Sequence, residues 1–224
     1  MGERVLIGWS GGKDSAMALW EVQKAGAYEV VALLTTVTEG YERVSMHGVR
    51  RALLIEQARA VGVPLQEVFI PPNAGNQEYE ARMEEVLRAY HAQGVRTVVF
   101  GDIFLEDVRQ YRETHLARIG MRGLFPLWKC DTQELVRRFL GAGFRAIAVC
   151  VDLKVLEASF AGRLLDEDFF RDLPPHVDPC GENGEFHSFV FDGPLFHQPV
   201  RFTRGEVVIR GDFGFCDLLP DACE

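Results

Sequence analysis

The sequence has few cysteines, and no two of them stand at a metal-binding spacing. The cysteines are Cys130, Cys150, Cys180, Cys216 and Cys223. Their number is odd and no Cys-x-x-Cys pair occurs, so we expect neither a disulfide framework nor a structural zinc site. Paired thiols for sulfur transfer are lacking as well.

Long apolar runs and an excess of basic residues are also lacking. No segment approaches the roughly 20 apolar residues of a membrane helix, and the N-terminus does not resemble a signal peptide, so we expect a cytoplasmic protein without membrane contact. The balance of 24 Lys and Arg against 33 Asp and Glu gives a net charge of −9. This charge argues against nucleic acid as a partner, because such binding depends on phosphate neutralisation. The sequence is compatible with a homo-oligomer.

Apolar runs alternate with helical patterns in the first half of the chain. The patterns predict strands at 4–9, 29–37, 65–70 and 96–100, and helices at 15–25, 50–61, 79–90 and 106–120. This alternation is typical of a parallel sheet with helical crossovers. We therefore predict an α/β fold whose first domain covers residues 1–124.

The pattern changes after residue 124. Asp131 and Glu134 form a capping signal for a helix, a strand follows at 144–151, and a short helix is expected at 164–173. Short strands are then predicted at 188–191, 200–203 and 207–210, the last two joined by a turn at Arg204-Gly205. We predict a smaller α+β domain over residues 125–224.

The most informative stretch is Ser10-Gly11-Gly12-Lys13-Asp14-Ser15, between the first strand and the first helix. Glycines let the backbone pass close to a ligand, and free N–H groups at a helix start favour an anion. The Walker A spacing is not met, because three residues instead of four separate Gly8 from Gly12, and Asp14 follows the lysine. The loop is nevertheless a candidate phosphate site.

In open α/β sheets, ligands bind beyond the carboxyl ends of the strands. The loop at 10–15, the strand end at Thr35 and Thr36, and Gly101-Asp102 are therefore expected to meet in one crevice. The segment 39–51 could overhang it, although we favour His47 as an ordinary loop histidine over a catalyst.

The helix at 106–120 offers two arginines close to this crevice. Val108, Tyr111, His115 and Ile119 form a stripe that we expect to face the core. Arg109 and Arg112 stand on a neighbouring face near the helix start. A role in binding substrate or phosphate and a role as solvated charges are equally compatible with this pattern.

A second cluster of polar residues runs from Asp178 to His187. It is compatible with a polar turn that has Asn183-Gly184 at its tip. Its glycines also allow the loop to enter a cleft, where Glu182 and Glu185 can bind magnesium, receive an ammonium group or accept a proton.

Two resemblances favour a functional interpretation of both loops. Ser10 to Ser15 resembles the pyrophosphate loop of the PP-loop ATPases, which adenylate a substrate and release pyrophosphate. Together with residues 181–186, Gly101-Asp102-Ile103 and residues 192–196, the chain resembles over about residues 4–216 the ATP-binding family that contains diphthine–ammonia ligase. This resemblance implies a Rossmann-like, HUP-type nucleotide-binding domain, a smaller C-terminal domain, and an active site between them.

The family's best-known activity implies ATP and Mg²⁺ as cofactors, ammonia or an amine as nitrogen donor, and a carboxylate substrate carried on an elongation factor. The roles implied are ATP binding by Ser10, Gly11, Gly12, Lys13, Asp14, Ser15, Thr35, Gly101 and Asp102; metal binding by Asp14 and Asp102; catalysis by Lys13, Glu182 and Glu185; and substrate binding by Arg109, Arg112, Asn183 and His187.

The second loop departs from the usual form of these ligases at Asn183, Phe186 and His187. These variants resemble a second branch of the family, so ATP activation is expected to carry over while the acceptor stays open. An ATP-binding sensor without chemistry is one alternative, against which the two glutamates argue. An adenylase acting on another small molecule or on tRNA is another, and the negative charge argues against the tRNA version.

Overall fold

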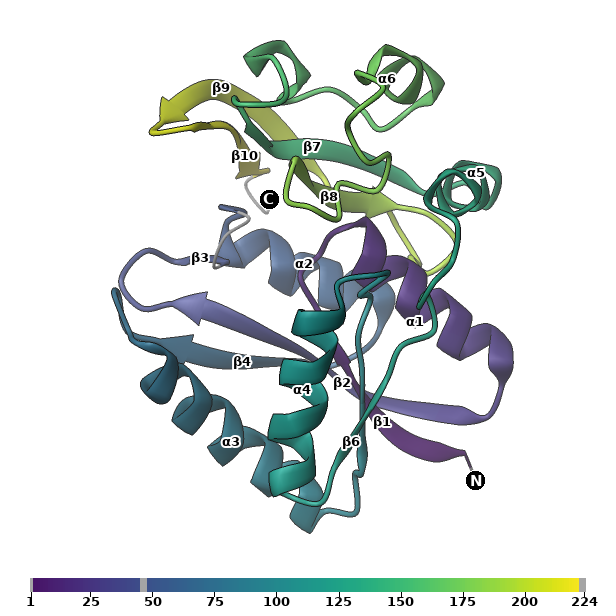
Figure 1. The fold of residues 1–224 in the computed structure, drawn as a ribbon, viewed down its shortest axis with the longest axis vertical. Helices are drawn as coiled ribbons and strands as arrows, with labels where there is room; N and C mark the ends of the chain where they lie inside the picture. Colours follow the sequence, from purple (N-terminus) through teal and green to yellow (C-terminus); the bar gives the residue numbers. More distant parts are fainter. Residues whose placement is uncertain (1, 45–47, 222–224) are drawn as a thin grey trace.

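The structure, a computed structural model, describes residues 2–44 and 48–221 and contains two β-sheets, one above the other in Figure 1. The lower sheet is parallel apart from one short strand, and helices cover both of its faces. The upper sheet is antiparallel. The predicted α/β fold with a smaller C-terminal α+β region is therefore confirmed.

Five parallel strands form the first sheet in the order β4, β2, β1, β5, β6. Their bounds are β1 Glu3–Gly8, β2 Tyr28–Thr38, β4 Leu65–Ile70, β5 Thr97–Val99 and β6 Arg122–Leu124. The short strand β3, Arg43–Val44, pairs antiparallel with the end of β2. The apolar runs of β1 and β2 are explained by burial on both faces of the sheet.

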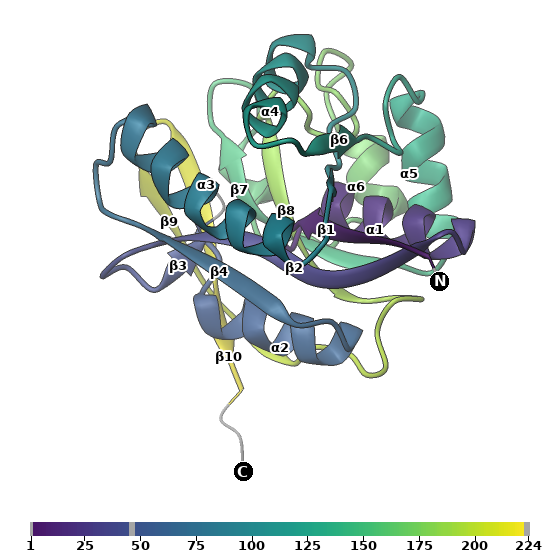
Figure 2. The same cartoon turned by 90° about the horizontal axis from the view of Figure 1, so that it is seen from below.

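Two pairs of helices cover the first sheet. α1, Lys13–Ala25, and α2, Arg51–Val61, contribute to one buried apolar cluster, and α3, Asn76–Ala92, and α4, Glu106–Arg118, contribute to another. Figure 2 shows α3 and α2 on opposite sides of β2 and β4. The four predicted helices are confirmed. No helix in the described ranges is long and apolar enough to cross a membrane.

The second sheet has the order β8, β7, β10, β9. Its strands are β7 Arg145–Asp152, β8 Phe186–Asp192, β9 Phe202–Arg210 and β10 Phe213–Pro220, and its helices are α5 Thr132–Gly141, the 3₁₀ turn η1 Ala158–Phe160, and α6 Glu167–Asp172. The Asp131 carboxylate caps α5 by accepting a hydrogen bond from the Glu134 backbone N–H at 2.8 Å, as predicted.

Both sheets share one buried cluster on the side of α1 and α2. Phe139 and Phe189 from the C-terminal region belong to the same cluster as Ile7 and Leu19 from the N-terminal region. Strand membership changes from the first sheet to the second between β6 and β7, which is where the boundary at residues 124 and 125 was expected. The division into two domains stays a prediction.

The predicted turn at Arg204-Gly205 is wrong. β9 runs without interruption through this point, and the chain reverses at Gly211, whose φ is 58°. Gly205 instead lies at a bulge, because the pairing of β9 with β10 shifts between Cys216 and Leu218. A Cβ at Gly205 would lie 3.1 Å from the carbonyl oxygen of Asp217, so glycine lets the two strands approach closely at the bulge.

Candidate functional site

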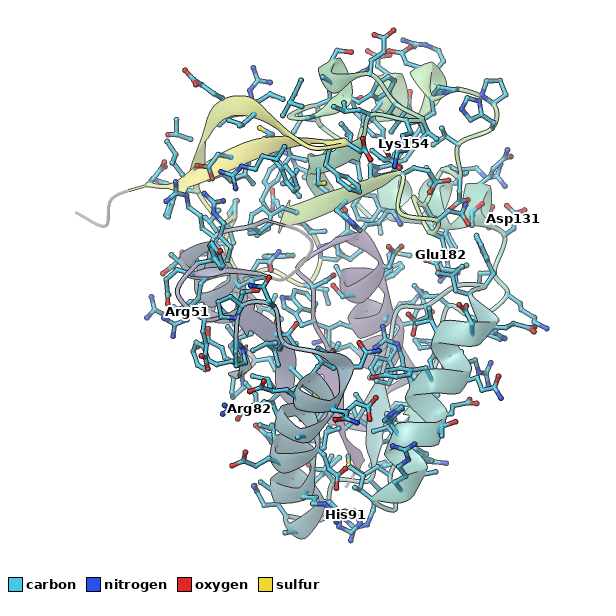
Figure 3. The ribbon with its side chains drawn as sticks, turned by 60° about the vertical axis from the view of Figure 1, so that its left-hand side comes forward. Arg51, Arg82, His91, Asp131, Lys154 and Glu182 are labelled. Carbon is cyan, nitrogen blue, oxygen red and sulfur yellow. The ribbon has the colours of Figure 1, made fainter. Side chains whose placement is uncertain are left out.

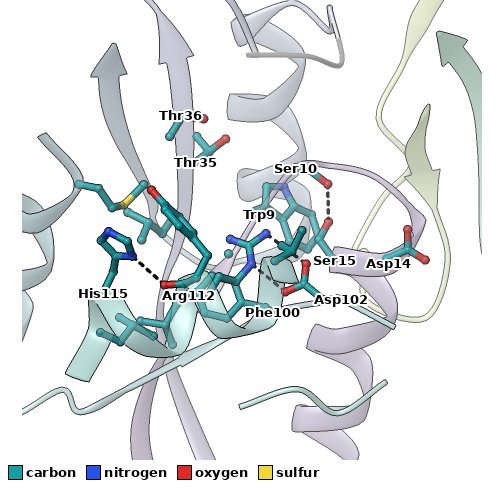
Figure 4. Close-up of a pocket in the computed structure, with 18 of the residues that line it drawn as sticks. Trp9, Ser10, Asp14, Ser15, Thr35, Thr36, Phe100, Asp102, Arg112 and His115 are labelled. Atoms are coloured by element: carbon teal, nitrogen blue, oxygen red, sulfur yellow. Dashed lines mark hydrogen bonds and ion pairs between the residues drawn. The ribbon is translucent and has the colours of Figure 1, made fainter. Parts of the chain in front are cut away.

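A cavity of about 530 Å³ lies at the carboxyl ends of β1, β2 and β5 (Figure 4). It is lined by the loop before α1, the end of β2, the loop after β5, facing sides of α3 and α4, and parts of the segment 181–187. The three segments predicted to converge therefore meet at one cavity. The second polar loop provides a further wall.

The predicted phosphate loop forms one wall of the cavity. Ser10, Asp14 and Ser15 line it, and the hydroxyl oxygens of Ser10 and Ser15 lie 3.3 Å apart. The N-cap residue of α1 is Gly12, which has no side chain to occupy this helix end. The positive end of the helix dipole and the N–H groups of the first turn favour an anion here.

Gln57 of α2 supports the phosphate loop by hydrogen bonds on the side away from the cavity. Its role was not predicted from the sequence. Gln57 is completely buried; its Nε2 donates to the carbonyl oxygens of Gly11 at 2.9 Å and Val190 at 2.5 Å, and its Oε1 accepts from Trp9 Nε1 at 3.0 Å. Gly11 has a φ of 78°, and a Cβ there would lie 2.7 Å from Gln57 Oε1. A lone amide within the apolar pattern of the helix at 50–61 was the available signal.

Lys13 lies behind the loop and does not line the cavity. Its side chain is buried and its ammonium group is paired with the Asp14 carboxylate. Burial is the largest single influence and disfavours the charged ammonium, but the interactions with Asp14 and Cys180 together outweigh it, so the pKa of Lys13 is raised above its ordinary value. Lys13 therefore stays charged. The nearby Cys180 thiol stays protonated, because burial raises its pKa to about 12.

The loop after β5 approaches the start of α1 very closely. A Cβ at Gly101 would lie 2.6 Å from the carbonyl carbon of Asp14, so only glycine fits. The next residue, Asp102, forms an ion pair with Arg112 of α4, with Nε and Oδ2 at 2.7 Å. The Arg112 guanidinium also stacks over the Phe100 ring at 4.3 Å. Gly101, Asp102 and Arg112 all line the cavity.

The other candidate arginine lies outside the cavity. Arg109 Nε pairs with Glu113 at 2.8 Å, and the guanidinium lies over the rings of Phe125 and Trp128 at 4.8 and 4.6 Å. The structure thus separates two arginines that the sequence could not distinguish, and only Arg112 reaches the cavity.

Glu182 brings the second polar loop to the cavity. Figure 3 shows this residue at the junction of the upper and lower halves of the molecule. Its Oε1 accepts hydrogen bonds from the backbone N–H groups of Ile103 at 2.7 Å and Phe104 at 3.4 Å. Burial raises the pKa of Glu182 to about 7. The nearby carboxylates of Asp14 and Asp102 also raise this pKa, whereas the two hydrogen bonds lower it. Near neutral pH, Glu182 can therefore accept or donate a proton.

Glu185 and Asn183 hold the second loop together. The Glu185 carboxylate is buried and accepts hydrogen bonds at 3.0 Å from the backbone N–H of Asp178, the backbone N–H of Asn183 and the Asn183 side-chain amide. Neither Glu185 nor Asn183 lines the cavity, whereas His187 does. Burial lowers the pKa of His187, which favours the neutral imidazole, although Asp14 opposes the shift.

Thr35, at the end of β2, marks a position where a polar group of a ligand fits. It lines the cavity, it is 3% exposed, and its hydroxyl has no hydrogen-bond partner among residues 2–44 and 48–221. A buried hydroxyl without a partner is costly, so a polar atom of a ligand is expected beside it.

The cavity extends into a largely apolar arm between α3 and α4. The apolar and aromatic residues that line it are Tyr79, Met83 and Leu87 of α3, Val108, Tyr111 and Leu116 of α4, and Ile119 just after α4, and the polar residues Glu80, Glu84 and His115 line the cavity from the same helices. The stripe on α4 that was expected to face the core therefore faces this arm in part. The expectation is wrong for Tyr111, which is 41% exposed, because the helices diverge and leave a cavity between them.

No group of three or more His, Cys, Asp or Glu side chains arranged for a metal occurs within residues 2–44 and 48–221. Asp14 and Asp102 both line the cavity, and metal binding by this pair stays a prediction. His47 and Cys223 lie outside the described residues.

The fold and the cavity define an α/β protein in which the predicted phosphate loop lies beside an acidic residue of raised pKa. Family comparison matches residues 3–123 to the diphthamide synthase N-terminal domain and residues 131–221 to the diphthamide synthase C-terminal domain. The chain belongs to the diphthamide synthase family.

Several similar proteins carry the name diphthine–ammonia ligase. Diphthine–ammonia ligase of Schizosaccharomyces pombe is 28% identical over 96% of this chain, which spans 38% of that protein's length. The Homo sapiens ligase is 24% identical over 96% of this chain and 88% of its own length, and the Danio rerio ligase is 26% identical over 93% and 90%.

Proposed function

We propose that this protein is an ATP-dependent ligase that adenylates a carboxylate and then transfers ammonia or an amine to form an amide. The observation that carries the proposal is that Glu182, a proton-accepting group near neutral pH, shares one cavity with the phosphate loop residues Ser10 and Ser15. A site that only holds ATP has no need of such a group. The names of the curated relatives support the same reaction.

The phosphates of ATP would lie at the start of α1, held by the backbone N–H of Asp14 and by the hydroxyls of Ser10 and Ser15, which line the cavity. Gly11 and Gly12 do not line it, and the Gly12 N–H donates to Ser10 Oγ at 3.3 Å, so these two glycines would act by shaping the loop. The base would enter the apolar arm between α3 and α4, where Tyr79 and Tyr111 offer aromatic surface. The Thr35 hydroxyl would then bond a polar atom of the nucleoside.

Mg²⁺ fits the carboxylates on this wall of the cavity. Asp14 and Asp102 would hold it together with phosphate oxygens and waters, as Mg²⁺ sites with few protein ligands do. When bound, the ion would offset negative charge on the phosphates.

In the first step, an oxygen of the substrate carboxylate attacks the α-phosphorus and the bond to pyrophosphate breaks, leaving an acyl-adenylate. Arg112, the arginine at the cavity, would orient the carboxylate, since guanidinium binds carboxylate in a bidentate manner. The start of α1, with charged Lys13 behind it, would stabilise the departing pyrophosphate.

In the second step, the nitrogen of ammonia or an amine attacks the acyl carbon and the carbon–oxygen bond to AMP breaks. The nitrogen gives up a proton, and Glu182 in its deprotonated form would accept it. Glu185 and Asn183 would act by positioning Glu182, because they hold the loop in place. Arg109 would act only through packing.

For the acceptor, we propose diphthine, as the names of the relatives suggest. We further propose that it is carried on an elongation factor in the cytoplasm, as the family resemblance implies. Purified protein would be incubated with ATP, Mg²⁺, ammonium and a panel of carboxylates that includes diphthine-bearing elongation factor, and the nucleotide product identified. We expect AMP and an amide in equal amounts. Formation of ADP would overturn the adenylation chemistry, and AMP formed only with another carboxylate would overturn the acceptor.

The variant Lys13→Ala tests the assignment of the loop. We expect its rate of AMP formation to fall by about 10² to 10³, the usual effect of removing one charge-stabilising group. A wild-type rate would contradict the assignment. Circular dichroism would show that the variant is folded.

A further inference from the structure

β9 forms an outer edge of the second sheet. It pairs with β10 on one side, and no strand in the described part of the chain pairs with its other edge (Figure 1). Its last residues carry an exposed apolar run, with Val207 and Val208 each 43% and Ile209 61% exposed. Natural edge strands are usually protected by charge, proline or a covering element, so an edge of this kind favours pairing with another strand.

The exposed run lies within a short, regular stretch of strand. On one side the bulge at Gly205 interrupts the pairing, and on the other side the chain turns at Gly211. Residues 207–210 between them keep an unbroken register with β10, and Glu206 adjoins them at the bulge. The stretch 206–210 is therefore the part of the edge that can add a further strand.

Two identical strands can pair in antiparallel fashion only in certain registers. Backbone N–H and C=O groups of successive residues point to opposite edges, so outward-pointing residues must meet outward-pointing residues. The two-fold axis of such a pair therefore lies midway between one residue and the same residue of the other copy, and an axis through a residue has this position.

The charges within 206–210 select one of these registers. An axis through Val208 places Glu206 of each copy opposite Arg210 of the other, with Val207 opposite Ile209. Both charged side chains are exposed, and neither forms an ion pair within the described residues. Opposite charges in directly opposed positions stabilise a strand pair.

The neighbouring registers lack this match. An axis through Val207 places Glu206 opposite Val208 and Arg210 opposite Arg204, so two positive charges meet. An axis through Ile209 places Glu206 opposite Asp212, so two negative charges meet. Only the register centred on Val208 is complementary in both charge and apolar surface.

We propose that two copies of this chain associate through antiparallel pairing of β9, with Val208 of one copy opposite Val208 of the other across the two-fold axis, so that their second sheets form one continuous sheet. No residue of 206–210 lines the cavity described above, so the proposal is independent of the proposed function.

The test uses the sign of the charges. Wild-type protein, Glu206→Arg, Arg210→Glu and the double variant would be compared by sedimentation velocity over a range of concentrations. We expect the wild type to show twice the mass of one chain, each single variant to dimerise about tenfold more weakly or worse because like charges face each other, and the double variant to recover. Mixing the two single variants would also restore dimers, because one variant then carries only positive and the other only negative charges at positions 206 and 210.

Glu85→Arg, a charge reversal at an exposed position of α3, is the matched control and should keep the wild-type mass. Recovery in the double variant and in the mixture shows that the single variants are folded. The proposal is overturned by a monomeric wild type at all concentrations, by single variants that dimerise as well as the wild type, or by a mixture that fails to associate.

Discussion

The Glu182 carboxylate accepts a hydrogen bond from the backbone N–H of Ile103 at 2.7 Å, and this bond joins the second polar loop to the loop after β5. The two residues lie 79 positions apart in the chain. The bond fixes the carboxylate in a partly buried place close to Asp14 and Asp102. Burial, with a smaller contribution from these two carboxylates, raises the pKa of Glu182 to about 7, although the hydrogen bond itself opposes the rise. A group with this pKa changes its protonation state within the pH range of the cell.

The first prediction concerns Glu182 as the proton acceptor. With free ammonia held constant, kcat/KM for ammonia should rise with pH and level off above about pH 7, as the carboxyl group loses its proton. In Glu182→Gln the rise should disappear and the rate at neutral pH should fall by about 10² to 10⁴. A variant that keeps the wild-type pH profile would show that another group accepts the proton.

The second prediction separates Arg112 from Arg109. Arg112 lines the cavity, and losing its charge-assisted bonds to a carboxylate in Arg112→Ala should raise KM for the acceptor about tenfold to hundredfold. Arg109→Ala removes the packing on Phe125 and Trp128 and the ion pair with Glu113, and it should leave KM unchanged while lowering stability by about 1 kcal/mol. Steady-state kinetics and denaturation would measure both, and equal effects on KM would refute the distinction.

The third prediction concerns Gln57. Gln57→Leu leaves the Trp9 N–H and the carbonyl oxygens of Gly11 and Val190 without their partner in a buried place. We expect a loss of about 3 kcal/mol in the free energy of unfolding and weaker ATP binding, since each unpaired buried group costs about 1–3 kcal/mol. Gln133→Leu, at an exposed position of α5, is the matched control. If both variants unfold alike, Gln57 does not support the loop.

The fourth prediction concerns Asp217, which connects β10 to the first half of the molecule. Its carboxylate pairs with Arg43 at 3.0 Å and Arg50 at 2.7 Å, and hydrogen bonding to Arg50 lowers its pKa to about 2. A lowered pKa stabilises the fold above the unfolded value of 3.8, and this contribution is lost as the pH falls through about 2.

Asp217→Asn should therefore be less stable than the wild type at neutral pH by about 1 kcal/mol, the scale of a partly exposed ion-pair network. The difference should shrink between about pH 4 and pH 2. Urea unfolding across this range measures it, and a difference that does not depend on pH would contradict the role of the carboxylate.

The parallel sheet, its helices and the phosphate loop could be predicted because each leaves a local pattern in the sequence. Strand ends such as Thr35 and Gly101 could be placed together by the topology of parallel sheets alone. Gly205 was misread because a glycine suits both a turn and a bulge, and only the pairing with β10 distinguishes the two.

The separate roles within the candidate site depend on contacts between distant segments. Nothing local distinguishes Arg109 from Arg112, whose surroundings come from residues 100–102 and 125–128. Glu182 and Glu185 differ in the same way, since one faces the cavity and the other holds its own loop. The apolar arm could not be foreseen, because helical periodicity does not show that two helices diverge.

The most direct test of the central claim follows an oxygen atom. Diphthine-bearing elongation factor would be prepared with ¹⁸O in the diphthine carboxylate and incubated with the protein, ATP, Mg²⁺ and ammonium. If the carboxylate attacks the α-phosphorus, the AMP that is released carries ¹⁸O from the substrate. If the label appears in inorganic phosphate, or if ADP is the product, the carboxylate is not activated as an adenylate and the proposed function is wrong.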